Sequence, residues 1–219
     1  MIVYNDARML NLLAHRYTGL FNGFIVCDTG STDGSLEVAK NLKAHVKSIP
    51  WKDFSTARNQ VITLAENLGY DYLFVMDADE AILVEHMSVI RSLAAISAYA
   101  FPRLEFIDDK DHINPLFYPD FHVRLFPLKQ GFHYRGALHE VVFQNGDKEN
   151  SMVANKVIKV PFVPIFHYAK IKPVQELALK YENQHRTAAN LPRLDTCQQP
   201  IPTSFSQGVK LRYYGQTPL

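Results

Sequence analysis

Apolar residues gather into short runs in the first half of the chain, and periodic, helix-like segments lie between these runs. The runs occupy residues 1–3, 23–27, 45–49 and 72–76. Their length and composition are those of buried strands. Between them, apolar residues recur at the spacing of one helix face, as in Val61, Leu64 and Leu68. This alternation predicts an α/β fold with a mostly parallel sheet flanked by helices.

The second half has a different pattern, with shorter β-like runs and many polar residues between them. These runs occupy residues 98–106, 121–126, 141–144 and 157–166. A helical pattern returns from Pro173 to His185, and the proline-rich stretch after Asn190 has an extended character. The expected divisions are one domain at 1–169, with halves at about 1–95 and 96–169, and a C-terminal helix with an extended tail at 170–219.

Three acidic residues follow the run at 72–76 within four positions. Asp77 and Asp79 are two apart, so their side chains point to the same side if strand geometry continues that far. Two carboxylates held close repel each other unless a divalent cation or hydrogen-bond donors offset the repulsion. Oxygen ligands of this kind suit magnesium or manganese, Mg2+ or Mn2+. The alternative is an acidic turn that caps a following helix.

Polar loops also follow the three earlier strands. Tyr4 and Asn5 come after the first, residues 28–34 after the second, and Arg58 lies in the first turn of the helix after the third. Ligands bind at the carboxyl ends of the strands in open α/β sheets, so the loops predict one shared site. Arg58 near a helix N-terminus invites an anion such as a diphosphate, and the alternative is an ion pair with Asp53.

Bulk composition narrows the class of protein. The 219 residues are 47% hydrophobic, which suits one domain with a sizeable core, and the formal net charge of +1 gives no reason to expect a nucleic-acid partner. No apolar run is long enough to cross a bilayer, and the N-terminus lacks the pattern of a secretory leader. We therefore expect a cytoplasmic protein. Cys27 and Cys197 form no disulfide framework or zinc motif.

The C-terminal part at 170–219 is mildly basic, with seven Lys or Arg residues and three Asp or Glu residues. A basic tail favours peripheral contact with the anionic inner face of a membrane or with a phosphorylated acceptor. The alternative is a solvated surface without a partner.

The motifs, taken in order, resemble those of the family 2 glycosyltransferases. The matching pieces are YND at 4–6, IVCDTGSTDGS at 25–35, WKDFSTARN at 51–59, MDADE at 76–80, VRLF at 123–126, YRGALHE at 134–140 and HY at 167–168. The resemblance implies the A-type glycosyltransferase fold, a nucleotide-sugar donor, a UDP-sugar above all, and a divalent metal on the donor diphosphate. Within the family, the chain most resembles the enzymes that build surface polysaccharides or modify peptides.

The resemblance also implies roles for individual residues. Asp77 and Asp79 match the metal-binding DxD pair, and His167 matches a third metal ligand late in the chain. The implied donor-binding residues are Tyr4, Asn5, Asp28, Arg58, Asn59, Asp77 and Ala78. The implied acceptor side comprises Glu80, Arg124 and His139, and the acceptor is a glycan, a lipid-linked molecule or a peptide.

Inverting transfer requires a carboxylate that takes the proton of the acceptor hydroxyl. Glu140 is the first candidate for this base and Asp120 the second. The alternative for Glu140 is a structural ion pair with Arg124 or Arg135. The alternative for His139 is a neutral, hydrogen-bonded histidine in the core.

Two rival functions remain open at this stage. A nucleotidyltransferase also places acids and a metal on an α/β sheet, but it usually has a Gly-rich, basic loop after the first strand, where this chain has Tyr4, Asn5 and Asp6. The second rival is a non-catalytic scaffold that binds nucleotide or glycan. The short first strand favours the scaffold, whereas the complete set of acidic and basic motifs favours the enzyme.

Overall fold

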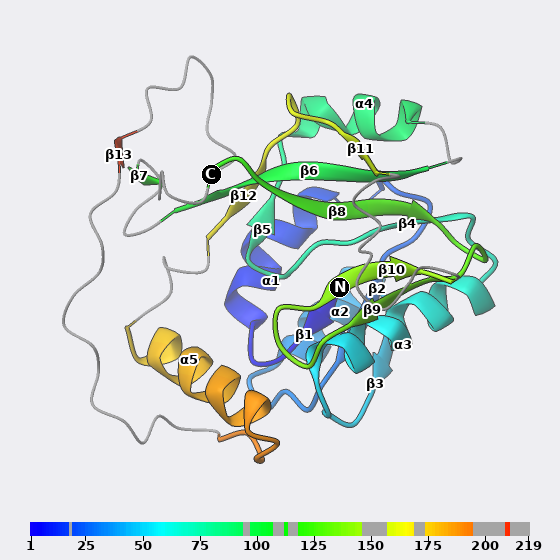
Figure 1. The fold of residues 1–219 in the computed structure, drawn as a ribbon. Coiled ribbons are helices and arrows are strands. Elements are labelled where there is room, and N and C mark those ends of the chain that lie inside the picture. The colour runs from blue at the N-terminus through cyan, green and yellow to red at the C-terminus, as the bar shows by residue number, and fades with distance from the viewer. Residues whose placement is uncertain are drawn as a thin grey trace.

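A computed structural model of the chain describes residues 1–17, 19–93, 97–106, 112–113, 118–145, 157–168, 174–194 and 209–210. Two main sheets, two two-stranded sheets and the surrounding helices make up a mixed α/β fold (Figure 1). The predicted fold class is therefore confirmed. The predicted boundary between 169 and 170, and most of the basic tail, lie outside the described residues.

The first sheet is parallel and has three strands, β1 (Ile2–Val3), β2 (Ile25–Asp28) and β3 (His45–Ser48), in that order. Its helices are α1 (Ala7–Leu13), α2 (Ser35–Asn41) and α3 (Phe54–Asn67), with a 3-10 turn η1 at Ala14–Tyr17. The central strand β2 is buried along its whole length because β1 and β3 cover its two edges and helices cover its faces.

The second sheet has six strands. It includes the apolar run at 72–76, which was predicted to be the fourth strand of the parallel sheet. Its order is β4 (Tyr72–Phe74), β8 (Asp120–Pro127), β6 (Ala98–Glu105), β12 (Ile165–His167) and β5 (Glu80–Ala81), and β11 (Val157–Lys159) also pairs with β6. Strand β4 pairs with β8 in antiparallel fashion, so only three of the four expected strands form the parallel sheet. The single run predicted at 157–166 divides into β11 and β12 around a turn.

The remaining elements are shorter or lie outside the two sheets. They are the hairpin β9 (Phe132–Arg135) and β10 (Val141–Gln144), the helices η2 (Val84–His86), α4 (Met87–Ser92) and α5 (Val174–Ala188), and the pair β7 (His112–Ile113) and β13 (Val209–Lys210). Asn59 on α3 exchanges two hydrogen bonds with the backbone of Tyr134 on β9, at 2.8 and 2.9 Å. These bonds fix the hairpin to α3.

Helix α3 begins at a side-chain cap. The Asp53 carboxylate accepts a hydrogen bond from the backbone N–H of Thr56 at 2.6 Å, and the Ser55 hydroxyl donates to the same carboxylate at 2.9 Å. Asp53 is therefore the N-cap of this helix. Arg58 forms its ion pairs with Asp77 and Glu140, so the alternative of a pair with Asp53 is wrong.

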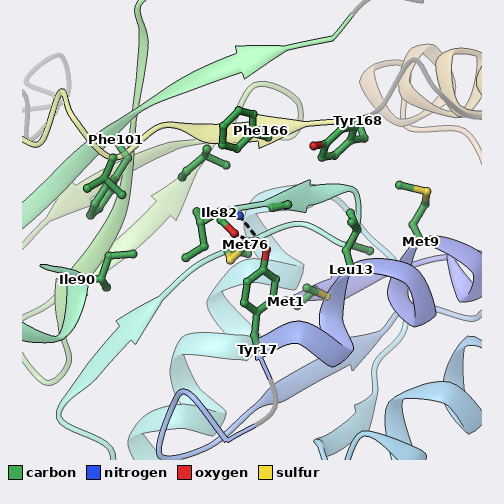
Figure 2. Packing of buried hydrophobic residues seen from close by; sticks show 14 of the residues in the cluster. Met1, Met9, Leu13, Tyr17, Met76, Ile82, Ile90, Phe101, Phe166 and Tyr168 are labelled. Atoms are coloured by element: carbon green, nitrogen blue, oxygen red, sulfur yellow. Dashed lines mark hydrogen bonds between the residues drawn. The ribbon is translucent and has the colours of Figure 1, made fainter. Parts of the chain in front are cut away.

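The core under the second sheet is joined to the N-terminal helices by a buried tyrosine. The Tyr17 hydroxyl accepts a hydrogen bond from the N–H of Ile82 at 2.8 Å and donates one to its carbonyl at 3.2 Å (Figure 2). Aromatic residues Phe101, Phe166 and Tyr168 pack in the same cluster. Within the described part of the chain, no helix is long and apolar enough to span a membrane.

Candidate functional site

A cavity of about 630 Å³ lies beside the ends of β1 and β4 and is closed on one side by α5 (orange in Figure 1). Ten of the residues predicted from the sequence line it: Tyr4, Asn5, Arg58, Asp77, Ala78, Asp79, Arg124, His139, Glu140 and His167. Four others, Asp28, Asn59, Glu80 and Asp120, are not among its lining residues. The predicted meeting of distant polar loops thus produces one hollow.

Asp77 lies between two guanidinium groups. Its carboxylate is 2.8 Å from Nη2 of Arg58 and 3.8 Å from Nη1 of Arg124. Burial alone would raise the pKa of Asp77, but the two arginines hold it below its ordinary value. Asp77 is therefore an ionised group whose charge is already balanced by the protein.

Arg58 also contacts the candidate base. Its Nε atom donates to Oε1 of Glu140 at 2.5 Å, and its guanidinium carbon lies 5.5 Å from the centre of the Tyr134 ring. Glu140 thus forms an ion pair, but its partner is Arg58 and not Arg124 or Arg135, which were the expected alternatives. Because α3 begins at Phe54, Arg58 is its fifth residue and lies just past the first turn where it was predicted, and the carboxylates of Asp77 and Glu140 neutralise it there.

Glu80 lies beneath the acidic loop and is 1% exposed. It forms a buried ion pair with Arg124, and its Oε2 accepts a hydrogen bond from the backbone N–H of Asp77 at 2.9 Å. Glu80 is not among the residues that line the cavity, and its implied place on the acceptor side stays a prediction. Its position lets it fix the conformation of the loop that carries Asp77 and Asp79.

Asp79 uses its two carboxylate oxygens in different directions. Oδ2 accepts a hydrogen bond from Nζ of Lys180 at 2.8 Å, and Oδ1 lies 3.6 Å from Nε2 of His167. Burial alone would lower the pKa of Lys180, but the Asp79 carboxylate holds it above its ordinary value. Lys180 comes from α5, 101 positions along the chain, and was missed because nothing in its local sequence marks it.

A divalent metal fits part of this donor set. Within the described residues, no three His, Cys, Asp or Glu side chains gather into a ready metal site. Asp77 points to guanidinium groups, whereas Asp79 Oδ1 and His167 Nε2 face each other without a normal hydrogen bond at 3.6 Å. One carboxylate oxygen and one imidazole nitrogen are suitable ligands for Mn2+. The donor atoms of Asp79 and His167 therefore fit the metal, whereas both oxygens of Asp77 face guanidinium groups.

Two of the remaining predicted residues build the loop at 28–34. The Asp28 carboxylate accepts hydrogen bonds from the backbone N–H groups of Gly30 and Ser31 at 3.1 and 3.2 Å. The Asn5 side chain accepts one from the N–H of Thr32 at 2.7 Å. These contacts close the loop against the end of β1 and stabilise the wall of the cavity near Asn5.

Asp120, the second candidate base, is engaged by its neighbours. Its Oδ2 lies 2.7 Å from Nε2 of His122 and 2.9 Å from Nη2 of Arg103. Burial alone would raise the pKa of Asp120, but these two hydrogen bonds hold it below its ordinary value. His122 lines the cavity, so Asp120 reaches the site through that imidazole.

His139 differs from its expected environment. It is exposed, and its backbone has a φ of 57°, which places it in a left-handed turn between β9 and β10. The expectation of a core histidine is therefore wrong. The turn carries the adjacent Glu140 toward Arg58.

Arg193, just after α5, fills an aromatic slot at the other end of the cavity. Its guanidinium carbon lies 3.2 Å from the centre of the Trp51 ring and 4.4 Å from that of Tyr4. Nη1 donates to Oγ1 of Thr29 at 3.0 Å, and burial lowers the pKa of Arg193 to about 10. The sequence gives no local signal for this contact.

The mixed α/β architecture is that of the A-type glycosyltransferase fold. Residues 1–94 match the family described as Glycosyl transferase family 2. The resemblance seen in the motifs is thereby confirmed over 94 of the 219 residues, and residues 1–94 are similar to family 2 glycosyltransferases.

Three known proteins give the extent of the similarity. A TPR repeat-containing protein of Synechococcus elongatus is 36% identical over 93 residues, which are 42% of this chain and 22% of that protein. The glycosyltransferase SunS of the Bacillus subtilis prophage SPbeta is 28% identical over 150 residues, which are 64% of this chain and 33% of SunS. The chain thus spans about a fifth to a third of the length of these relatives.

The solved structure of mannosyltransferase PcManGT from Pyrobaculum calidifontis, in complex with GDP-Man and Mn2+, has a similar fold. The TM-score is 0.51 at 12% sequence identity, over 86% of this chain and 62% of that one. At this identity the likeness concerns the fold alone.

Proposed function

We propose that this chain catalyses the metal-dependent transfer of a sugar from a nucleotide-sugar donor, a UDP-sugar above all, to a glycan, lipid-linked or peptide acceptor with inversion. The observation that carries the proposal is the pairing of Asp79 Oδ1 with His167 Nε2 at 3.6 Å, in the wall of a cavity that also contains Tyr4 and Glu140. Similarity to SunS, named a glycosyltransferase, supports the same conclusion.

Asp79 and His167 would hold the metal, Mn2+ or Mg2+, which supplies a Lewis acid for the charge of the departing diphosphate. Asp77 has a different role in this proposal, because Arg58 and Arg124 already occupy its oxygens. It joins the acidic loop to α3 and β8 and so positions Ala78 and Asp79. Tyr4 and Asn5 lie at the nucleoside end of the cavity, beside the end of β1.

Glu140 accepts the proton of the acceptor hydroxyl. Arg58 occupies Oε1 of Glu140, which leaves Oε2 as the atom that takes the proton while the acceptor oxygen attacks the anomeric carbon. His122 is the second candidate, because it lines the cavity and Asp120 orients its ring. Arg124 and His139 lie on the acceptor side of this arrangement.

A thermal-shift comparison tests the proposal. We expect UDP with Mn2+ to raise the melting temperature more than either component alone, because a ligand that binds only the folded state stabilises it. GDP belongs in the same panel, because PcManGT was solved with GDP-Man. Stabilisation by nucleoside triphosphates alone would favour a nucleotidyltransferase, and no response to any nucleotide would favour a scaffold.

Two proposals concern the surroundings of the enzyme. The acceptor class, including surface polysaccharide, follows from the resemblance and needs an acceptor screen. A cytoplasmic location with peripheral membrane contact through the basic tail rests on a segment that lies mostly outside the described residues. Flotation with vesicles containing anionic lipid, compared with neutral vesicles, tests that contact.

A further inference from the structure

Helix α5 contributes a cation to the cavity at the same place as the acidic loop. The side chain of Lys180 is 32% exposed and lines the cavity, while its ammonium group reaches the 5% exposed side chain of Asp79 at 2.8 Å. An ammonium group has three donor hydrogens, and the Asp79 carboxylate accepts one of them. Lys180 therefore retains hydrogen-bonding capacity toward the cavity.

The two arginines beside the acidic loop are committed to carboxylates. Arg58 contacts Asp77 and Glu140, and Arg124 contacts Asp77 and Glu80. Both arginines are almost fully buried, with side chains 8% and 5% exposed. An incoming diphosphate therefore meets a site in which the arginine charges are already balanced, and Lys180 is the more exposed cation beside Asp79.

The chain after α5 extends this wall toward the other end of the cavity. Arg193 lies on the faces of Trp51 and Tyr4 and donates to Thr29. One segment, 174–194, thus places Lys180 beside the acidic loop and Arg193 beside the end of β1. A ligand that spans the cavity between these ends contacts this segment along its length.

We infer that Lys180 is a donor-binding residue that contacts the diphosphate of the nucleotide sugar. This inference rests on the proposed function, and it assigns to α5 a part of the donor site. In the ligand-free protein Asp79 holds the ammonium group in place. When the donor binds, the remaining N–H groups of Lys180 donate to diphosphate oxygens, forming charge-assisted hydrogen bonds.

A purely structural role makes a different prediction. If Lys180 only anchors α5 to Asp79, its removal loosens the wall and weakens every ligand of the cavity alike. If it contacts the diphosphate, its removal weakens charged ligands and leaves an uncharged one unaffected. The ratio of diphosphate affinity to nucleoside affinity therefore separates the two roles.

The experiment measures binding of UDP, GDP and the matching nucleosides to the wild type and to Lys180→Met and Lys180→Arg, each with Mn2+ and with EDTA. Titration calorimetry suits the diphosphates, and saturation-transfer NMR suits the nucleosides. Lys40→Met is the matched control, because Lys40 is exposed on α2. EDTA isolates the part of the affinity that does not depend on metal.

We expect Lys180→Met to weaken diphosphate binding by about tenfold or more, with nucleoside binding changed by less than about twofold. Lys180→Arg retains the charge and most of the affinity, and Lys40→Met binds like the wild type. Equal losses for diphosphate and nucleoside, or no loss, would overturn the inference. Failure of the wild type to bind any diphosphate would instead overturn the proposed function.

Discussion

Arg58 and Glu140 form a hydrogen-bonded ion pair at 2.5 Å although 82 positions separate them in the chain. The pair joins α3 to the turn after β9, and Asp77 completes it from the acidic loop. Three segments from distant parts of the sequence thus meet at one guanidinium group. Arg58 consequently has a structural importance that its local sequence does not indicate.

Replacing Arg58 by Met is expected to lower the free energy of unfolding by about 3–5 kcal/mol, because two carboxylates lose their buried cation. Urea unfolding followed by circular dichroism measures the change. Arg91→Met on α4 is the control, because Arg91 is exposed. A loss as small as that of the control would contradict the assigned role.

Replacing Asp79 by Asn should lower the rate of sugar transfer by about a hundredfold or more. Loss of a residue that only hydrogen-bonds to a metal ligand already lowers activity by about 10- to 100-fold, and loss of the ligand itself should lower it at least as much. The fold should persist, since the amide still accepts a hydrogen bond from Lys180. Turnover with Mn2+ and the circular dichroism spectrum are the two measurements. Activity like that of the wild type would exclude Asp79 as a ligand.

The identity of the base is tested by Glu140→Gln and Asp120→Asn. We expect Glu140→Gln to lower turnover by about a hundredfold or more while donor affinity changes little, since a general base acts on the acceptor proton. The measurements are turnover number and UDP affinity for both variants. A larger loss of turnover in Asp120→Asn would transfer the role to the pair formed by His122 and Asp120.

The lowered pKa of Asp77 predicts a loss of stability in acid. Below about pH 4 the unfolded chain takes up a proton at Asp77, whereas the folded state keeps the carboxylate ionised between its arginines. The stabilisation is present above that pH and is lost as the pH falls through the lower folded pKa. The difference in unfolding free energy between wild type and Asp77→Asn should therefore shrink from pH 6 to pH 3, and a constant difference would refute this.

Replacing Tyr17 by Phe removes the hydroxyl that both accepts from and donates to Ile82 in the core. The backbone N–H and carbonyl of Ile82 then remain buried without this partner, and a loss of about 1–3 kcal/mol is expected. Urea unfolding provides the value. Tyr72→Phe is a suitable control because Tyr72 is 44% exposed.

The sequence by itself determined the alternation of strands and helices in the first half, the acidic loop and the resemblance to the family 2 glycosyltransferases. These signals are local: apolar runs mark buried strands, and Asp77, Asp79 and the residues 25–35 belong to contiguous motifs. Even His167, far along the chain, was found because the family pattern names it. The convergence of these residues on one cavity also followed from the sequence, through the general geometry of α/β sheets.

Only the tertiary structure decided which charges meet. Arg58 pairs with Glu140, Glu80 pairs with Arg124, and Lys180 reaches Asp79, each across a long separation in the chain. Strand β4 likewise joins β8 because hydrogen-bonding partners in a sheet are chosen by the whole topology. A lone Lys on a helix carries no local mark of its partner, since ion pairing depends on positions in space that the entire fold sets.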